Sequence, residues 1–513
     1  MSTRAGARLV RLPLRPARSL HRLRRPFDSI WNEPMPPTDE PPAKNAPLPG
    51  LRRALGFRDV MLFFITAGVN LQWVATASAA GPGAVTIWLI AFVTMAVPLA
   101  LTIVELSSRY PEEGGMYVWS GKAFGEFAAF MTGWTYGMSN LPYFPVVLYF
   151  AAANALYMGG AGWRALSGSP AYFVLASLAG LALGTLPNLF GLQFGKRLSN
   201  LGAYARWAAT LALIALGAAA WIRFGPATEF SRASLIPDLG VKNLLFWSSI
   251  AFALTGLEAA SFMGEEIRDA RRTVPRALAI SVPLITLTYI LGTICVLVAL
   301  PQGQVSGLQG PIDAIDAAAR RLGLPAVTPL AACLLTLSAL GSVGAWLAAV
   351  ARLPFVAGLD RLLPTSFGRI HPKWRTPHVA LLWLAFVEVA CVFLSQAGQT
   401  VRGAYDVLVS MTVICTLIPF LFLFASMIRL QREPAAPGVF RVPGGRPVAT
   451  VAGVVGFAVT AVSIVLSFFP AQDEPDKTLA VAKILGLTVL STGSGVVVYW
   501  LRRRRRRVAA TRA

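Results

Sequence analysis

Long apolar stretches recur along almost the whole chain, separated by short polar connections. A helix that crosses a bilayer needs about 20 mostly apolar residues, and twelve windows meet that requirement. Only helices and closed barrels satisfy every backbone group inside lipid, and stretches of this length are typical of helices. We therefore predict an all-α integral membrane protein with twelve transmembrane helices, at 58–79, 84–108, 123–158, 171–190, 199–222, 243–264, 274–300, 325–351, 378–396, 403–430, 447–469 and 478–501.

The composition agrees with this pattern. Hydrophobic residues make up 55% of the 513 residues and charged residues only 14%, which is too few to cover a water-facing surface. The formal net charge is +22, which in a soluble protein would indicate a nucleic-acid partner. Here the basic residues fall in tails and short loops, so we expect the lipid bilayer as the partner and no nucleic acid.

The loop charges predict how the chain crosses the membrane. With the N-terminus inside, the five inner loops carry 17 Lys and Arg residues and the outer loops carry 8. Lysine and arginine accumulate in cytosolic loops, and both tails are basic, which requires an even number of spans. We therefore expect a multi-pass protein of the cell membrane with both termini in the cytosol.

The chain divides into five parts. Residues 1–50 hold eight arginines in the first 25 positions and then many prolines, which indicates a disordered basic cytosolic tail; an organellar transit peptide stays open. The predicted spans one to five occupy 51–224 and spans six to ten occupy 243–430. Spans eleven and twelve occupy 447–501, and 502–513 form a basic cytosolic tail that starts with six arginines.

Two spans carry helix-breaking or polar residues near their centres. The first has Gly68 and Asn70, and the sixth has Gly256 beside Glu258. A single glycine in a span is also explained by close helix packing. Spans one and six would be equivalent if two five-helix repeats were related by inversion, and breaks at equivalent positions indicate a substrate site at the membrane midplane.

Several segments resemble the amino acid–polyamine–organocation (APC) permeases of the amino acid transporter type. The resemblance covers roughly 56–430, and the order of the segments is more specific than any one of them. The matching segments are Leu254–Glu258, Gly264–Asp269, Arg271–Ala277, Glu105–Pro111, Tyr117–Trp119, Asp360–Pro364, His371–Pro372 and Thr376–Pro377. The resemblance implies a LeuT-like bundle, with a 5+5 inverted repeat and two extra helices.

In such a bundle each broken span would bind one end of the substrate. The start of the outer half of span one exposes N–H groups that suit a carboxylate, and the inner end of the broken span six exposes carbonyls that suit an ammonium group. The expected substrate-binding residues are Gly68, Val69, Asn70, Ala251, Phe252, Ala253 and Leu254.

The resemblance also suggests gating and coupling residues. Phe252 aligns with an aromatic that closes the site toward the outside, although a lipid-facing or core side chain is the alternative. Glu258 aligns with an acid implicated in proton coupling, and a structural acid hydrogen-bonded between helices is the alternative. Asn140 in span three would line the cavity or serve as an interhelical amide.

Arg206 lies well inside span five. Related sodium-coupled folds have a cation site in this region, and sodium-independent members often place a lysine there. Arginine stays protonated, so it would fill such a site permanently without carrying a titrating proton. This predicts sodium independence, whereas a side chain that snorkels to the cytosolic headgroups is the alternative.

The sequence thus predicts a secondary active transporter for amino acids or related amines that works by alternating access. Uniport, proton symport and exchange stay open, as do a polyamine or organic-amine substrate and a non-transporting membrane sensor. No catalytic, phosphate-binding or metal-binding motif is present, so we expect no enzyme, no metal and no cofactor. The four cysteines have no metal spacing, and the oligomeric state stays open, a homodimer included.

Overall fold

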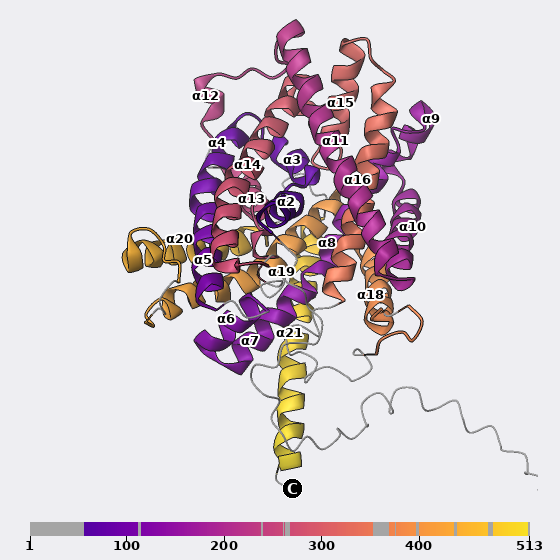
Figure 1. Cartoon of the computed structure of the whole chain (residues 1–513). Helices are drawn as coiled ribbons and strands as arrows, with labels where there is room; N and C mark the ends of the chain where they lie inside the picture. Colours follow the sequence, from indigo (N-terminus) through magenta and orange to yellow (C-terminus); the bar gives the residue numbers. More distant parts are fainter. Residues whose placement is uncertain are drawn as a thin grey trace, which may run out of the picture.

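The computed structural model contains helices throughout the residues it describes, arranged as one bundle (Figure 1). Those residues are 56–110, 114–237, 240–259, 261, 267–351, 369–374, 376–396, 400–434, 439–469 and 476–510. The predicted tail 1–50, the inner loop at 352–368 and the last three residues lie outside them.

The helices have the following bounds: α2 Phe57–Gly68, α3 Leu71–Ser78, α4 Gly83–Ala91, η1 Phe92–Ala96, α5 Val97–Arg109, α6 Met116–Phe124, α7 Glu126–Met138, α8 Asn140–Ala155, α9 Gly160–Arg164, η2 Ala165–Gly168, α10 Pro170–Leu189, α11 Leu192–Phe224, α12 Arg232–Leu235, α13 Val241–Ala253, α14 Ala270–Ala299, η4 Gln302–Gln304, α15 Gly310–Arg321, α16 Val327–Val350, α18 His378–Gln396, α19 Val401–Leu430, α20 Gly445–Leu466 and α21 Lys477–Ala510.

The number of membrane-crossing helices agrees with a multi-pass protein. Within the described residues, nine helices are long and apolar enough to cross a membrane, and the bent pair α2 and α3 adds a tenth. The other two predicted spans are represented by the consecutive helices α7 and α8 and by α13, after which 260 and 262–266 lie outside the described residues. The exact count of twelve therefore stays a prediction.

Span one is interrupted where the sequence predicted. Helix α2 ends at Gly68, α3 begins at Leu71, and the two axes differ by 42°. Span two is continuous over Gly83–Arg109 and contains one π-helical turn, η1.

Span three differs from the single long helix that its apolar run predicted. Helices α6 and α7 are separated at Gly125, whose φ of +89° suits glycine, and a second interruption at Ser139 separates α7 from α8. The amide of Asn140 bonds to the carbonyls of Tyr136 and Gly137 and thereby compensates the last turn of α7. The predicted span 123–158 is thus divided between α7 and α8, and α6 ends as that span begins.

Local sequence explains where several other helices begin. Ser169 accepts a hydrogen bond from the Tyr172 N–H at the start of α10, and Pro170 fills the first helical position. Thr400 accepts from Gly403 at the start of α19 in the same manner. These caps fix the ends of two spans that flank α8.

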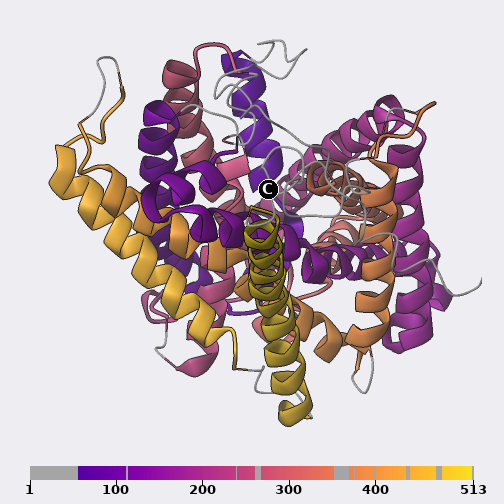
Figure 2. The same ribbon diagram turned by 90° about the horizontal axis from the view of Figure 1, so that it is seen from below.

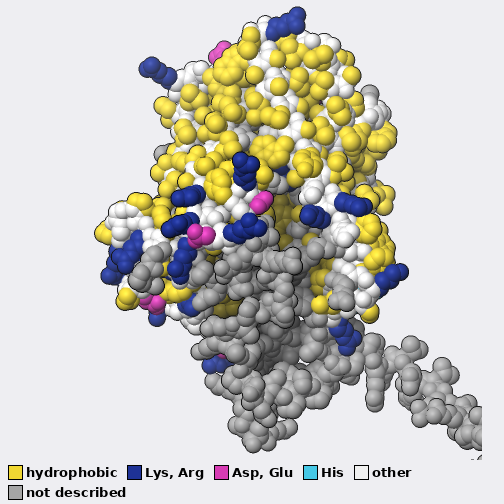
Figure 3. Space-filling view, in the orientation of Figure 1, with side chains coloured by type: hydrophobic (Ala, Val, Ile, Leu, Met, Phe, Trp, Pro, Cys, Tyr) yellow, Lys and Arg dark blue, Asp and Glu magenta, His cyan; other side chains and the backbone are white. Residues whose placement is uncertain are grey.

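The outer surface is apolar over much of its area (Figure 3). Large apolar side chains such as Leu175, Phe386, Val489 and Val93 are at least 63% exposed, which is expected where lipid replaces water as the surrounding medium. Lysine and arginine side chains gather in a band across the lower half of this view. Helix α21 leaves the bundle at that end (Figure 1), and α20 runs along the edge (Figure 2), packed against α19, α13 and α5.

Close helix contacts surround the interrupted spans. A side-chain carbon at Gly202 of α11 would lie 2.6 Å from the Cα of Gly341 of α16, so the two backbones nearly touch. Helix α14 packs along both α2 and α3. Span seven therefore lies beside both halves of span one, and spans five and eight form a tightly packed pair.

Candidate functional site

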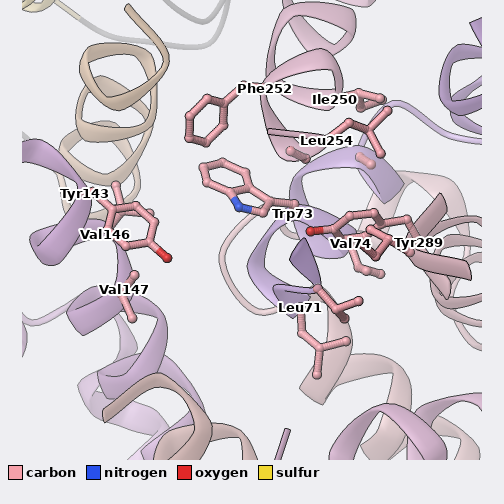
Figure 4. Close-up of a cluster of buried hydrophobic side chains, with 14 of the residues drawn as sticks. Leu71, Trp73, Val74, Tyr143, Val146, Val147, Ile250, Phe252, Leu254 and Tyr289 are labelled. Atoms are coloured by element: carbon pink, nitrogen blue, oxygen red, sulfur yellow. The ribbon is translucent and has the colours of Figure 1, made fainter. Parts of the chain in front are cut away.

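A cavity lies in the centre of the bundle, beside the breaks in spans one and six. Its aromatic lining residues are Trp73, Tyr136, Tyr143, Phe252 and Trp346, and the other lining residues are Ala67, Asn70, Ser139, Asn140, Ala253, Thr255, Gly256, Glu258 and Thr416. Figure 4 shows Tyr143 across from Trp73 and Phe252. A small apolar cavity with a few convergent polar groups has the form of a site for a small molecule.

The breaks in the two spans face each other. The backbone of Gly256 has a φ of +97°, which an L side chain rarely adopts, and a side-chain carbon there would lie 3.6 Å from the carbonyl oxygen of Ala67. The two irregular segments are thus in contact, and both residues line the cavity. Irregular backbone at membrane depth is tolerated where it is enclosed in protein or lines a cavity.

The break in span one is held by side-chain hydrogen bonds. The side-chain amide of Asn70 donates to the Ala67 carbonyl (3.2 Å), and the hydroxyl of Tyr289 donates to the Gly68 carbonyl (2.5 Å). The same hydroxyl accepts from the Asn70 backbone N–H (3.0 Å). Of the three residues predicted to bind substrate here, Asn70 lines the cavity, whereas Gly68 and Val69 form the break behind it.

The break in span six begins where α13 ends. The Leu254 N–H bonds to the Ala251 carbonyl (3.3 Å), and Thr255 bonds to the Phe252 carbonyl through both its N–H (2.9 Å) and its hydroxyl (2.7 Å). These two carbonyls are therefore engaged within the turn. Of the four predicted residues, Phe252 and Ala253 line the cavity, and Ala251 and Leu254 lie buried behind them.

Glu258 connects the break in span six to span three. One carboxylate oxygen accepts from the Gly256 N–H (2.8 Å), and the other accepts from the Tyr136 hydroxyl (3.2 Å). The residue is buried and lines the cavity. It therefore makes the hydrogen bonds between segments that the structural alternative expected, and because it also lines the cavity, proton coupling stays a prediction.

Phe252 faces the cavity and not the lipid. Its ring packs edge-on against Trp73 of α3, with 4.9 Å between the ring centroids. Helices α3 and α13 contact each other, so this pair lies where the two half-helices approach. Such edge-to-face aromatic contacts are favourable, and both rings of this pair line the cavity.

Arg206 points into the bundle, not toward the headgroups. The guanidinium donates to the carbonyl of Thr66 in α2 and to the hydroxyls of Ser338 (3.2 Å) and Ser342 in α16. The residue is 6% exposed. The snorkelling alternative is therefore wrong, and the positive charge lies between spans one, five and eight, where the resemblance implied a cation site.

Two other acidic side chains in the spans, Glu105 and Glu388, differ in their surroundings. Glu105 pairs with Arg109 one turn later at 2.8 Å, as residues four apart on a helix can. Glu388 of α18 is fully buried, and neither carboxylate oxygen has a hydrogen-bond partner among the described residues. No group of three or more His, Cys, Asp or Glu side chains within the described part of the chain could hold a metal ion.

Sequence reasoning missed much of the cavity wall. Tyr136, Tyr143 and Trp346 have the pattern of ordinary buried aromatics, so periodicity alone could not separate them from core. The break at Ser139 had a weak signal, because a glycine, a serine, an asparagine and Pro142 occur within six residues. Thr416 gave no signal of its own.

Comparison with known proteins identifies the class. The family model described as amino acid permease matches residues 55–490, which is most of the chain. The chain belongs to this family of membrane transporters, which confirms the APC resemblance and the expectation that the protein is not an enzyme.

Three curated relatives have transport names. An uncharacterized transporter of Legionella pneumophila is 27% identical over 433 residues, covering 83% of this chain and 92% of the relative. The branched-chain amino acid permease BcaP of Bacillus subtilis is 26% identical and covers 77% and 84%. The probable agmatine/putrescine antiporter AguD of Lactococcus lactis is 23% identical and covers 75% and 81%.

A solved structure supports the fold. The chain matches MhsT in complex with L-phenylalanine with a TM-score of 0.51 at 14% identity, covering 84% of this chain and 98% of that one. This likeness confirms the all-helical LeuT-like bundle that the sequence predicted.

Proposed function

We propose that this transporter carries an amino acid or a related amine and binds it in the cavity between the two broken spans. The contact between Gly256 and Ala67 at the wall of that cavity is the observation that supports the proposal most directly. Relatives that carry branched-chain amino acids and agmatine or putrescine are consistent with this substrate class.

The substrate would be oriented by the two breaks. The start of α3 presents the positive end of a helix dipole toward a carboxylate, with Asn70 at the N-cap position. The end of α13, at Ala253, would offer the negative end of a helix dipole to an ammonium group. Asn140 and Ser139, at the interruption of span three, would contact the remainder of the substrate.

The proposed cycle is alternating access, with spans one, two, six and seven moving as a unit against the rest. The Phe252 and Trp73 rings close the cavity on the side of α3, which the loop charges assign to the outside. The positive band in Figure 3 then faces the cytosol, and α21 leaves the bundle on that side. In the proposed cycle, this arrangement of the two rings corresponds to a closed outer gate.

Transport would be independent of sodium. The guanidinium of Arg206 fills the space between spans one, five and eight and bonds to Thr66, Ser338 and Ser342. A fixed positive charge there disfavours a second cation. Glu258 is the candidate proton carrier, because it is the one acidic side chain among the cavity-lining residues.

A polycationic substrate is the second candidate, favoured by the likeness to the agmatine/putrescine antiporter. The lining argues against it, because a second ammonium group would lack a carboxylate partner once Glu258 is engaged. A monoamine or an amino acid has no second ammonium group and so avoids the free-energy cost of burying an unpaired charge.

Counterflow in proteoliposomes tests the proposal. Vesicles loaded with one unlabelled compound from a panel of amino acids, monoamines and polyamines are diluted into the same labelled compound, with and without sodium. We expect transient accumulation of an amino acid or amine at equal rates in both media. Accumulation that requires sodium would exclude the role given to Arg206, and no accumulation with any compound would contradict the substrate class.

A further inference from the structure

Span seven runs along the whole of span one. Ser281 of α14 donates to the Met61 carbonyl in α2 (3.3 Å), and a side-chain carbon at Gly68 would lie 2.6 Å from Ile285. Tyr289 reaches the break, and a side-chain carbon at Gly292 would meet Val74 of α3 at 3.2 Å. Spacings of four, four and three residues put these contacts on one helix face.

The break exists because particular hydrogen bonds of a continuous helix are replaced. In an unbroken α-helix the Asn70 N–H would donate to the Thr66 carbonyl, four residues earlier. Here the Thr66 carbonyl accepts from Arg206, and the Asn70 N–H donates to the Tyr289 hydroxyl. The acceptor of the missing backbone hydrogen bond is thus bound by a side chain of span five, and its donor is bound by a side chain of span seven.

The next two carbonyls of α2, which lack the hydrogen bonds of a continuous helix, accept hydrogen bonds from side chains. The Ala67 carbonyl accepts from the Asn70 side chain, and the Gly68 carbonyl accepts from Tyr289. A tyrosine hydroxyl can donate and accept at once, so Tyr289 satisfies one donor and one acceptor with a single atom. Buried backbone groups need such partners, because lipid offers none.

Tyr289 is itself held rigidly. Its ring stacks on Trp88 of α4 with 4.5 Å between the centroids and 6° between the planes, and the Trp88 indole N–H donates to Thr293 (3.0 Å). Both rings are fully buried, and Tyr289 is not among the cavity-lining residues. The hydroxyl therefore binds the backbone of the break without facing the cavity itself.

We propose that Tyr289 is a positioning residue for the substrate site: together with Arg206, it keeps span one broken by binding the two ends of the hydrogen bond that would continue the helix through Asn70. The consequence is that Ala67 and Asn70 stay at the cavity wall and the start of α3 stays open to a ligand. This inference rests on the proposed function, because it concerns the same site.

The test is Tyr289→Phe in the reconstituted full chain, which keeps the ring and removes the hydroxyl. With the substrate found by counterflow, we expect KM to rise about tenfold, as for the loss of one net hydrogen bond, and Vmax to change little. Tyr172→Phe is the matched control, because that hydroxyl bonds to the Ala152 carbonyl between two helices outside the site. We expect its KM to equal that of the wild type.

A second readout does not depend on transport. Hydrogen exchange of the Asn70 amide should change at least several-fold in Tyr289→Phe, faster if the N–H is released and slower if the helix closes. Exchange in α10 should stay constant. Should Tyr289→Phe not fold, Thr293→Val removes the acceptor of Trp88 and should shift KM and Asn70 exchange in the same sense by a smaller factor.

The outcomes separate the two proposals. A wild-type protein that shows no counterflow contradicts the proposed function and leaves the Asn70 exchange to test Tyr289. A wild-type protein that transports, with unchanged KM and unchanged Asn70 exchange in Tyr289→Phe, overturns the role of Tyr289 alone. An equal KM shift in Tyr172→Phe would also overturn it, because the effect would then be general loosening of the bundle.

Discussion

Glu258 links two elements that move relative to each other in the proposed cycle, since it bonds to Gly256 in the moving span six and to Tyr136 in span three. If it carries the coupling proton, Glu258→Gln should abolish accumulation driven by a pH gradient and preserve counterflow, because glutamine keeps an acceptor oxygen but cannot titrate. The measurement is uptake with and without an imposed pH gradient.

Glu388→Gln is the matched control for that experiment. Glu388 is also a fully buried carboxyl, but it lies in α18 and is not among the cavity-lining residues. We expect pH-driven accumulation to be unchanged in this variant. Retained accumulation in Glu258→Gln would remove Glu258 from the proton path.

Gly256 illustrates how one residue fixes the shape of the cavity. Its φ of +97° costs an L residue about 1–2 kcal/mol, whereas the space at its side-chain position is sufficient for a methyl group. We expect Gly256→Ala to lower the melting temperature and to raise KM.

Gly486→Ala in α21 is the control, because a methyl group there meets no atom within 4 Å. Its melting temperature should equal or slightly exceed that of the wild type. If both variants behave alike, the conformation at Gly256 does not strain an alanine.

At the scale of elements, α15 lies over the outer half of span one. A side-chain carbon at Gly310 would lie 3.4 Å from the Cα of Ala75 in α3. Asp313 accepts from the Tyr157 hydroxyl just beyond α8, and Asp316 pairs with Arg164 of α9 (3.1 Å). These contacts attach α15, which lies in the loop between spans seven and eight, to the end of span three.

The attachment should depend on pH. Burial raises the pKa of Asp313 to about 6, with the Tyr157 hydrogen bond and Arg164 acting in the opposite direction and Asp316 adding to the rise. Release of α15 would expose the carboxyl and return its pKa toward 3.8, so the docked form binds the proton more tightly. Acidification from pH 7 to pH 5 therefore favours docking, and a rise through pH 6 weakens it.

A spin-label distance between α15 and η2 measures this effect. Labels at the exposed positions Arg321 and Leu166 should report a longer or broader distance distribution at pH 7.5 than at pH 5. Asp313→Asn should give the same distribution at both values. A wild-type distribution that does not respond to pH would contradict the role of Asp313.

The elements also show how far the sequence could predict this protein. Apolar length identified the helical bundle and most span limits, and Gly68 with Asn70 located the first break, because these features follow from local chemistry. The break at Ser139 was missed, since a long apolar run does not reveal a local interruption. Tyr289 was missed as well, because its role depends on a contact 219 residues away in sequence.

On the scale of the whole molecule, two groups of spans meet at the break in span one. Trp88 and Tyr289 connect spans two and seven to that break through stacking and hydrogen bonds, which is consistent with their moving together. Arg206 connects the same break to spans five and eight. Alternating access would then require the Arg206 contacts to rearrange while the Tyr289 contacts persist.

The measurement that tests the central claim most directly is a cryo-electron microscopy map of the protein with its transported substrate, identified by counterflow. The account predicts ligand density between the two breaks, in contact with Asn70 on one side and Ala253 or Gly256 on the other. Density that lies elsewhere in the bundle, with this cavity empty at saturating substrate, would contradict it.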